Sequence, residues 1–427
     1  MTRPACSWVQ ASSLSLGMLF LFVLLPVSLG ADTLRVLAIG QVLPGESPLD
    51  VWFSADPLVD YVVVPTDMDF SSSLPVYDQK SLAQAWRRFI RLYFPKTRKD
   101  LVEGFDFLVF PDGNIYYFTP SQIADIKYAI EKGVGSFVTM GGGMSSVSVG
   151  LFPTWINYGL SEVLPIVPNE KMKQDATSGF SIKVVKKDPP VLWMLVPFGI
   201  EKVVGMYAFT NIYPRAGATT WANLISHGSP LPQGSPGAWL VSWRFGSGLS
   251  WAVADDLDST WWSSVYWPTQ NKYAYDVFFN ILVYSTGRPL PPNIPVIHDL
   301  RARFAQYRQE KAVLLSLLDF IGRFGANTQP VEVLVRGADA LKERSFDAYA
   351  EGSYEEALRL IRDASRKMSS ISADAVKLKA KALLWVYITE WSAVTGVLFA
   401  SGLALYSLMI RRRVYREVET TRLRSLE

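Results

Sequence analysis

The chain has 427 residues, a formal net charge of +3 and one cysteine, Cys6. We expect Cys6 to be removed with an N-terminal signal segment, which excludes thiol chemistry, disulfides and soft-metal sites in the mature protein. Residues 411–427 carry a charge of +3 and the first thirty residues +1, so the rest carries −1. This balance offers no electrostatic argument for binding nucleic acid.

Residues 1–30 are predicted to be a signal peptide. Arg3 precedes a short apolar run, Leu16–Leu25, and small residues follow from Ser28. The run is shorter than the roughly 20 residues that cross a bilayer, and this arrangement is typical of a cleaved export signal. An uncleaved N-terminal anchor is the alternative.

Residues 31–289 alternate strand-like apolar runs with helical segments. Several runs are almost continuously apolar, as expected for strands covered by helices on both faces. Strand, helix and strand in that order predict an α/β domain with a doubly wound parallel sheet. The expected strands are Thr33–Gly40, Tyr61–Pro65, Phe105–Phe110, Gly135–Met140, Ala238–Arg244 and Leu249–Ala254, and the expected helices include Ser81–Phe94 and Thr119–Lys132.

Two segments follow predicted strands at the edge where open α/β sheets bind ligands. Residues 141–143 are glycines, which let backbone amides approach a ligand closely. Residues 255–258 form an acidic turn directly after another strand. We expect both segments to face one crevice, with Trp261 lining the crevice or the core beneath it. The candidate ligand-binding residues are Gly141, Gly142, Gly143, Ser145, Asp255, Asp256, Asp258 and Trp261.

Each candidate also has a plainer interpretation. The carboxylates of Asp255, Asp256 and Asp258 suit a hard cation such as Ca²⁺. A role in capping the following turn is favoured instead. We expect no metal and no cofactor. Ser145 with His227 would make a hydrolase pair, although the serine lacks the second glycine of a nucleophile elbow. The aromatic residues between 239 and 267 form either a platform for a sugar or peptide or ordinary core packing.

Two sequence blocks carry a family resemblance. They are FDFLVFPDGNIYYFTPSQIADIKYAIEKGVGSFVTMGGGMSSVSVG and WLVSWRFGSGLSWAVADDLDSTWWSSVYW, the latter followed by the aromatic helix YAYDVFFNILVYSTG. Together they resemble the cysteine-less branch of the class I glutamine amidotransferase-like superfamily, near its trehalose-utilisation-type members. The resemblance spans about residues 33–289 and implies a flavodoxin-like sheet. It implies no catalysis, because the cysteine nucleophile is absent and Thr260 stands where the family pattern has histidine.

A proline-rich linker at 290–298 leads into a helical stalk, residues 299–390. Within it, residues 338–364 resemble a single tetratricopeptide-type hairpin with Gly352 in the turn, and a plain antiparallel bundle is the favoured alternative. The expected helices are His298–Phe324, Val331–Tyr349, Tyr354–Met368 and Ala373–Thr389, the last continuing into the apolar segment that follows.

Residues 391–410 are predicted to be a transmembrane helix. The segment is uncharged and about one bilayer long, and arginines at 411–413 and 416 place its end in the cytoplasm. Trp385, Tyr387 and Trp391 suit the outer membrane interface. These features predict a single-pass type I protein of the cell membrane with a cytoplasmic basic tail, and the tail resembles the ends of archaeal surface proteins.

The sequence therefore favours a membrane-anchored, extracytoplasmic binding or assembly protein without enzymatic activity. One alternative is a surface hydrolase that acts on a sugar or peptide through residues 255–258. Another is a subunit of a larger membrane complex. The expected partners are the bilayer through 391–410, proteins through the stalk, and a sugar or peptide ligand, but not nucleic acid.

Overall fold

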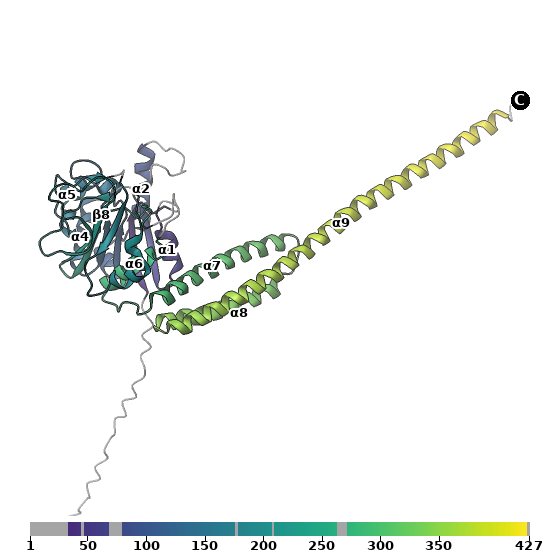
Figure 1. Ribbon diagram of the computed structural model, residues 1–427. Helices are drawn as coiled ribbons and strands as arrows, with labels where there is room; N and C mark the ends of the chain where they lie inside the picture. The colour runs from purple at the N-terminus through teal and green to yellow at the C-terminus, as the bar shows by residue number, and fades with distance from the viewer. Residues whose placement is uncertain are drawn as a thin grey trace, which may run out of the picture.

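A computed structural model describes residues 33–43, 47–67, 79–175, 178–206, 209–262 and 271–424. The predicted signal segment lies outside these residues, as do Tyr266 and Trp267 of the aromatic stretch. The described chain forms an α/β head, residues 33–293, and a stalk of long helices (Figure 1).

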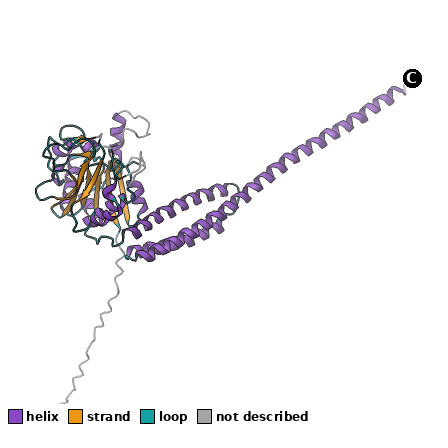
Figure 2. Cartoon of the chain, viewed as in Figure 1, coloured by secondary structure: helices purple, strands orange, loops and turns teal. Residues whose placement is uncertain are grey.

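The head is built on an eight-stranded sheet with the order β2-β1-β3-β4-β10-β9-β8-β6 (Figure 2). The first five strands in this order pair in parallel, and the last three pairings are antiparallel. A second, two-stranded sheet pairs β5 (Gln174–Asp175) with β7 (Phe209–Thr210). The strands of the large sheet are β1 (Leu34–Gly40), β2 (Val59–Pro65), β3 (Phe107–Phe110), β4 (Gly135–Thr139), β6 (Phe180–Val184), β8 (Thr219–Ser226), β9 (Ala238–Phe245) and β10 (Gly248–Val253).

The α/β class is confirmed, and the expected parallel sheet is confirmed in part, because the sheet is parallel from β2 to β10 and antiparallel from β10 to β6. β9 and β10 form an antiparallel hairpin because only Gly246 and Ser247 join them, and so short a link cannot connect parallel strands. Gly246 adopts a φ of 60°, the conformation that such tight turns favour. Strand pairing in the sheet therefore changes from parallel to antiparallel at this hairpin.

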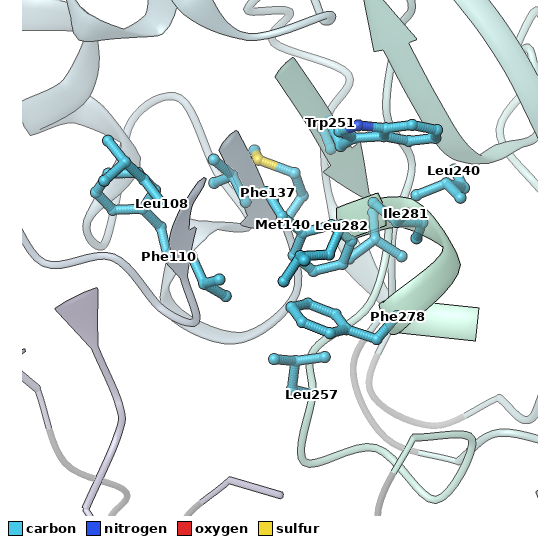
Figure 3. Close-up of a cluster of buried hydrophobic side chains, with 14 of the residues drawn as sticks. Leu108, Phe110, Phe137, Met140, Leu240, Trp251, Leu257, Phe278, Ile281 and Leu282 are labelled. Atoms are coloured by element: carbon cyan, nitrogen blue, oxygen red, sulfur yellow. The ribbon is translucent and has the colours of Figure 1, made fainter. Parts of the chain in front are cut away.

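The head's helices are short and pack on the sheet through apolar faces. Phe278 of α6 packs edge-on against Phe137 of β4, with ring centroids 5.3 Å apart, and Figure 3 shows this contact within the buried cluster. Trp52 and Phe53 of α1 also contact Phe278, so α1 and α6 cover the same face. The helices are α1 (Leu49–Ala55), α2 (Gln79–Tyr93), α3 (Arg98–Gly104), α4 (Pro120–Glu131), α5 (Phe152–Asn157) and α6 (Ala274–Ser285), with short 3₁₀ turns at Gly142–Met144, Leu160–Val163, Trp193–Phe198 and Ile200–Lys202.

Three long helices, α7 (Ile294–Arg323), α8 (Gln329–Ala350) and α9 (Tyr354–Arg424), make the stalk around a core of their own. Buried residues of α9 alternate at spacings of four and three, the pattern of coiled-coil packing. They include Ala357, Ile361, Ala364, Met368, Ile371 and Ala375. The helices thus form an antiparallel bundle, and the predicted break between Met368 and Ala373 is wrong because Ile371 and its neighbours pack on α7 and α8.

Arg301 of α7 connects the stalk to the head. Its Nε lies 2.6 Å from Asp56 Oδ2, and its Nη1 lies 2.5 Å from Asp276 Oδ1 in α6. All three side chains are at most 3% exposed. Tyr349 of α8 donates a hydrogen bond to the same Asp56 oxygen at 3.1 Å, and His298 bonds Asp276 at 2.7 Å.

Replacing Arg301 with methionine should destabilise the protein by about 3–5 kcal/mol, because Asp56 and Asp276 would remain buried without their cation. The free energy of unfolding in urea, followed by tryptophan fluorescence, measures this loss. Arg308→Met, on an exposed position of the same helix, is the matched control. Equal, small changes in the two variants would contradict the structural role of Arg301.

Candidate functional site

The structure brings the glycine turn and the acidic turn together. β4 and β10 are adjacent parallel strands, so residues 141–143 and 255–258 leave the same edge of the sheet. The Met140 amide donates to the Val253 carbonyl at 2.8 Å, and the Gly141 amide donates to the Asp255 carbonyl at 3.3 Å. The expected meeting of the two segments is therefore observed, whereas ligand binding there remains a prediction.

Sequence reasoning missed the residue that completes this site, Asp112. It follows β3, the other neighbour of β4, and its backbone adopts a positive φ of 42°. Its amide donates to Thr139 Oγ1 at the end of β4 at 3.0 Å. The signal was present in the sequence, since only Pro111 separates Asp112 from a predicted strand and Asp112 lies in the PDG turn.

Asp112 and Asp256 meet over Gly142. A Cβ at Gly142 would lie 2.5 Å from Asp112 Oδ2 and 2.6 Å from Asp256 Oδ2. The φ of Gly142 is also positive, at 49°. Only glycine therefore fits beneath the two carboxyl groups, for reasons of both space and backbone conformation.

The two carboxyl groups lie close together over Gly142, and their proximity favours the protonated form of Asp112. Burial raises the pKa of Asp112 well above its usual range, and the adjacent charge of Asp256 raises it further. Asp67 and Asp258 add smaller repulsions. Asp112 Oδ1 is buried and has no hydrogen-bond partner among the described residues, although the residue as a whole is partly exposed because its other atoms reach solvent.

The side chain of Asp255 forms hydrogen bonds within the acidic turn and the residues that follow it. Its side chain is fully buried and accepts hydrogen bonds from Ser259 Oγ at 3.0 Å and Trp262 Nε1 at 3.1 Å. Burial raises its pKa to about 7, against the two hydrogen bonds that favour the charged form. Asp256 Oδ1 accepts from the amide of the next residue, Leu257, at 2.8 Å.

Trp261 lies in the core beneath the turn. Its ring centroid is 4.6 Å from those of Trp239 and Trp262, and none of the three is more than 1% exposed. Trp239 and Trp262 stack on each other with an interplanar angle of 16°. These three tryptophans therefore support the site from below and do not form a surface for stacking a ligand.

The proposed serine–histidine pair is not assembled. Ser145 Oγ donates to Gln174 Oε1 at 3.2 Å, whereas His227 Nε2 bonds Ser181 Oγ at 2.9 Å. No group of three or more metal-ligating side chains suited to a metal ion occurs among the described residues. What the site offers is a close pair of carboxyl groups, Asp112 and Asp256, beside glycine amides, and such groups can bind hydroxyl or amide groups.

Comparison with known proteins gives no family assignment, since neither a family model nor a curated protein matches the chain. Among solved structures, a cytoplasmic protein of Salmonella typhimurium is 18% identical, covering 59% of this chain and 99% of its own, with a TM-score of 0.41. A ThuA-like protein from Parabacteroides merdae is 9% identical, covering 60% and 91%, with a TM-score of 0.34. A β-galactosidase from Rahnella is 13% identical, covering 62% and 32%, also at 0.34. Likenesses this distant carry no argument about function.

Asp255 should make stability depend on pH. A carboxyl group with a pKa near 7 when folded and 3.8 when unfolded stabilises the fold at low pH, and this contribution is lost as pH rises from about 4 through 7. The loss of stability is on the order of a few kcal/mol, and Asp255→Asn should reduce it. Thermal unfolding measured across this pH range checks the prediction. Asp60→Asn, at an exposed position of β2, is the control. Identical pH profiles for the wild type and Asp255→Asn would contradict the prediction.

Proposed function

We propose that the protein is a membrane-anchored, extracytoplasmic binding or assembly protein with no catalytic activity. The observation that carries the proposal is α9, a single 71-residue helix that leaves the stalk bundle and continues through the apolar segment (Figure 1). It is the one helix among the described residues that is long and apolar enough to cross a membrane. The side chains of residues 391–410 are exposed, as lipid-facing residues would be.

The proposed orientation is type I, with the head and stalk outside the cytoplasm and residues 411–427 inside. The arginines at 411–413 directly follow the apolar segment and favour a cytoplasmic C-terminus. Bilayer lipids are then the partner of residues 391–410. The stalk, which is held to the head by Arg301, would hold the crevice at a fixed distance from the bilayer and remains the proposed contact for protein partners.

We propose that the head is a flavodoxin-like, amidotransferase-like domain. It retains the crevice at the ends of the parallel strands but lacks the cysteine nucleophile needed for amidotransfer. The parallel strands run in the order β2-β1-β3-β4-β10, which is the flavodoxin-like 2-1-3-4-5 order when β10 is counted as the fifth strand. The only cysteine of the chain is Cys6, so a cysteine nucleophile at residues 141–143 is excluded. Glycine amides with Asp112 and Asp256 suit a sugar or peptide ligand held by hydrogen bonds.

A hydrolase is the second candidate, supported by the Asp112–Asp256 pair. Two carboxyl groups that share a proton can act as acid and base on a peptide bond. A glycosidase is less well supported, because its carboxyl groups stand about 5–9.5 Å apart, farther than a hydrogen bond. Membership of a larger membrane complex would be compatible with either role.

Protease treatment of sealed cells tests the anchor and its orientation. A tag fused after Glu427 should stay protected while the head and stalk are digested, because residues 411–427 lie inside in the proposed topology. Permeabilised cells, in which the tag becomes accessible, are the control. Digestion of the tag in sealed cells would reject the proposed orientation.

The absence of catalysis is tested with the purified full-length chain in detergent. We expect no ammonia release from glutamine, and no more hydrolysis of peptide or glycan mixtures than Asp256→Asn shows. Mass spectrometry measures both activities, the first as conversion of glutamine to glutamate and the second as cleavage products in the mixtures. Turnover by the wild type that Asp256→Asn abolishes would instead establish the hydrolase.

A further inference from the structure

Positive charge is concentrated where α2 joins α3. Residues 87–99 contain six arginines and lysines and no carboxylate, and all six side chains are exposed. Arg98 pairs with Asp125 at 2.6 Å, and Lys99 lies 3.8 Å from Glu103. The other four form no ion pair with any acidic side chain of the described residues. This is a strong local positive charge on a head that is otherwise acidic, since residues 33–293 hold 20 lysines and arginines against 22 aspartates and glutamates.

Apolar side chains lie exposed among these cations. Trp86 and Ile90 of α2 and Phe94, the residue after it, are buried at spacings of four residues and cover one side of the helix. Leu92 and Tyr93 are 58% and 50% exposed beyond that buried side. Arginine next to exposed tyrosine and leucine is the composition of protein-binding surfaces, where aromatic residues and arginine dominate the binding energy.

The surface is hollowed at two places. A hollow of about 520 Å³ on α2 is lined by Arg88, Phe89, Leu92 and Tyr93, among others. A second, of about 560 Å³, lies between α3 and α4, where Arg98 and Lys132 flank the ring of Tyr128 at 4.6 and 5.2 Å. Both are large enough to receive side chains of a partner, and both combine cations with aromatic rings.

We propose that this α2–α3 surface, residues 84–99 with Tyr128 and Lys132, binds an acidic polypeptide segment that also carries apolar side chains. Its carboxylates would pair with Arg88 and Arg91, whose guanidinium groups match carboxylates in geometry. Its apolar side chains would cover Leu92 and Tyr93. An acidic glycan or a nucleic acid satisfies the cations but leaves Leu92 in water, which favours the polypeptide. The inference rests on the proposed binding role, but not on the membrane anchor.

Binding is tested with the full-length chain in nanodiscs of neutral lipid and a fluorescent peptide of Glu-Glu-Leu repeats, using fluorescence anisotropy. Arg88→Ala combined with Arg91→Ala should weaken binding about tenfold, since exposed ion pairs contribute up to roughly 1 kcal/mol each. Arg308→Ala combined with Arg336→Ala removes the same charge from exposed positions of the stalk and should leave binding within about twofold. Equal losses in both variants, or no binding at ~0.1 M salt, would overturn the proposal.

The apolar contribution is tested separately. Leu92→Ala should weaken binding of the Glu-Glu-Leu peptide severalfold but leave binding of oligoglutamate unchanged. Polygalacturonate or duplex DNA that binds as tightly as the peptide, together with no effect of Leu92→Ala, would overturn the polypeptide assignment. None of these results alters the protease-protection test, so failure of this inference is distinguishable from failure of the proposed anchor.

Discussion

One buried cation sets how the head and stalk are arranged. Arg301 binds Asp56, which follows α1, and Asp276 in α6, so a stalk helix is attached to two separate elements of the head. Removing these charges from water costs several kcal/mol per ion, which only close and well-aligned contacts offset. The Phe279 ring also contacts the guanidinium group, with its centroid 3.7 Å from the guanidinium carbon. A displaced α7 would lose all these contacts together, so the network favours one orientation of the stalk over its alternatives.

The crevice depends on a different constraint, the convergence of strand ends in a parallel sheet. β3, β4 and β10 are neighbours, so the residues that follow them must crowd together. Crowding two carboxyl groups in a buried position is unfavourable unless a proton is retained between them. Gly142 makes the approach sterically feasible, and the buried tryptophans below the turn prevent the acidic segment from relaxing inward. The surrounding packing therefore maintains an unfavourable closeness of two carboxyl groups at this site.

The sequence was most informative where a feature is local. The alternation of apolar runs predicted the α/β class, and residues 141–143 and 255–258 were predicted to meet because both follow strands. The antiparallel half of the sheet was missed, although Gly246-Ser247 between two strands is a hairpin signal. Asp112 was missed although it follows a predicted strand, as residues 141–143 and 255–258 do, because a single aspartate in a PDG turn has the composition of an ordinary turn. A helix break was predicted between Met368 and Ala373, but packing of Ile371 and Ala375 overrides the weak helix propensity of the serines there.

The two connections at the ends of the stalk have different mechanical consequences. The connection to the head is ionic and buried, whereas α9 leaves the bundle with no glycine or proline until Gly396, inside the apolar segment. A continuous helix resists bending, because a kink requires a disruption of its hydrogen-bonded ladder. In the proposed membrane setting, tilting α9 would therefore tilt the whole bundle, and Arg301 would carry that tilt to α1 and α6. The orientation of the crevice relative to the bilayer would then be determined by the stalk rather than by contacts of the head itself.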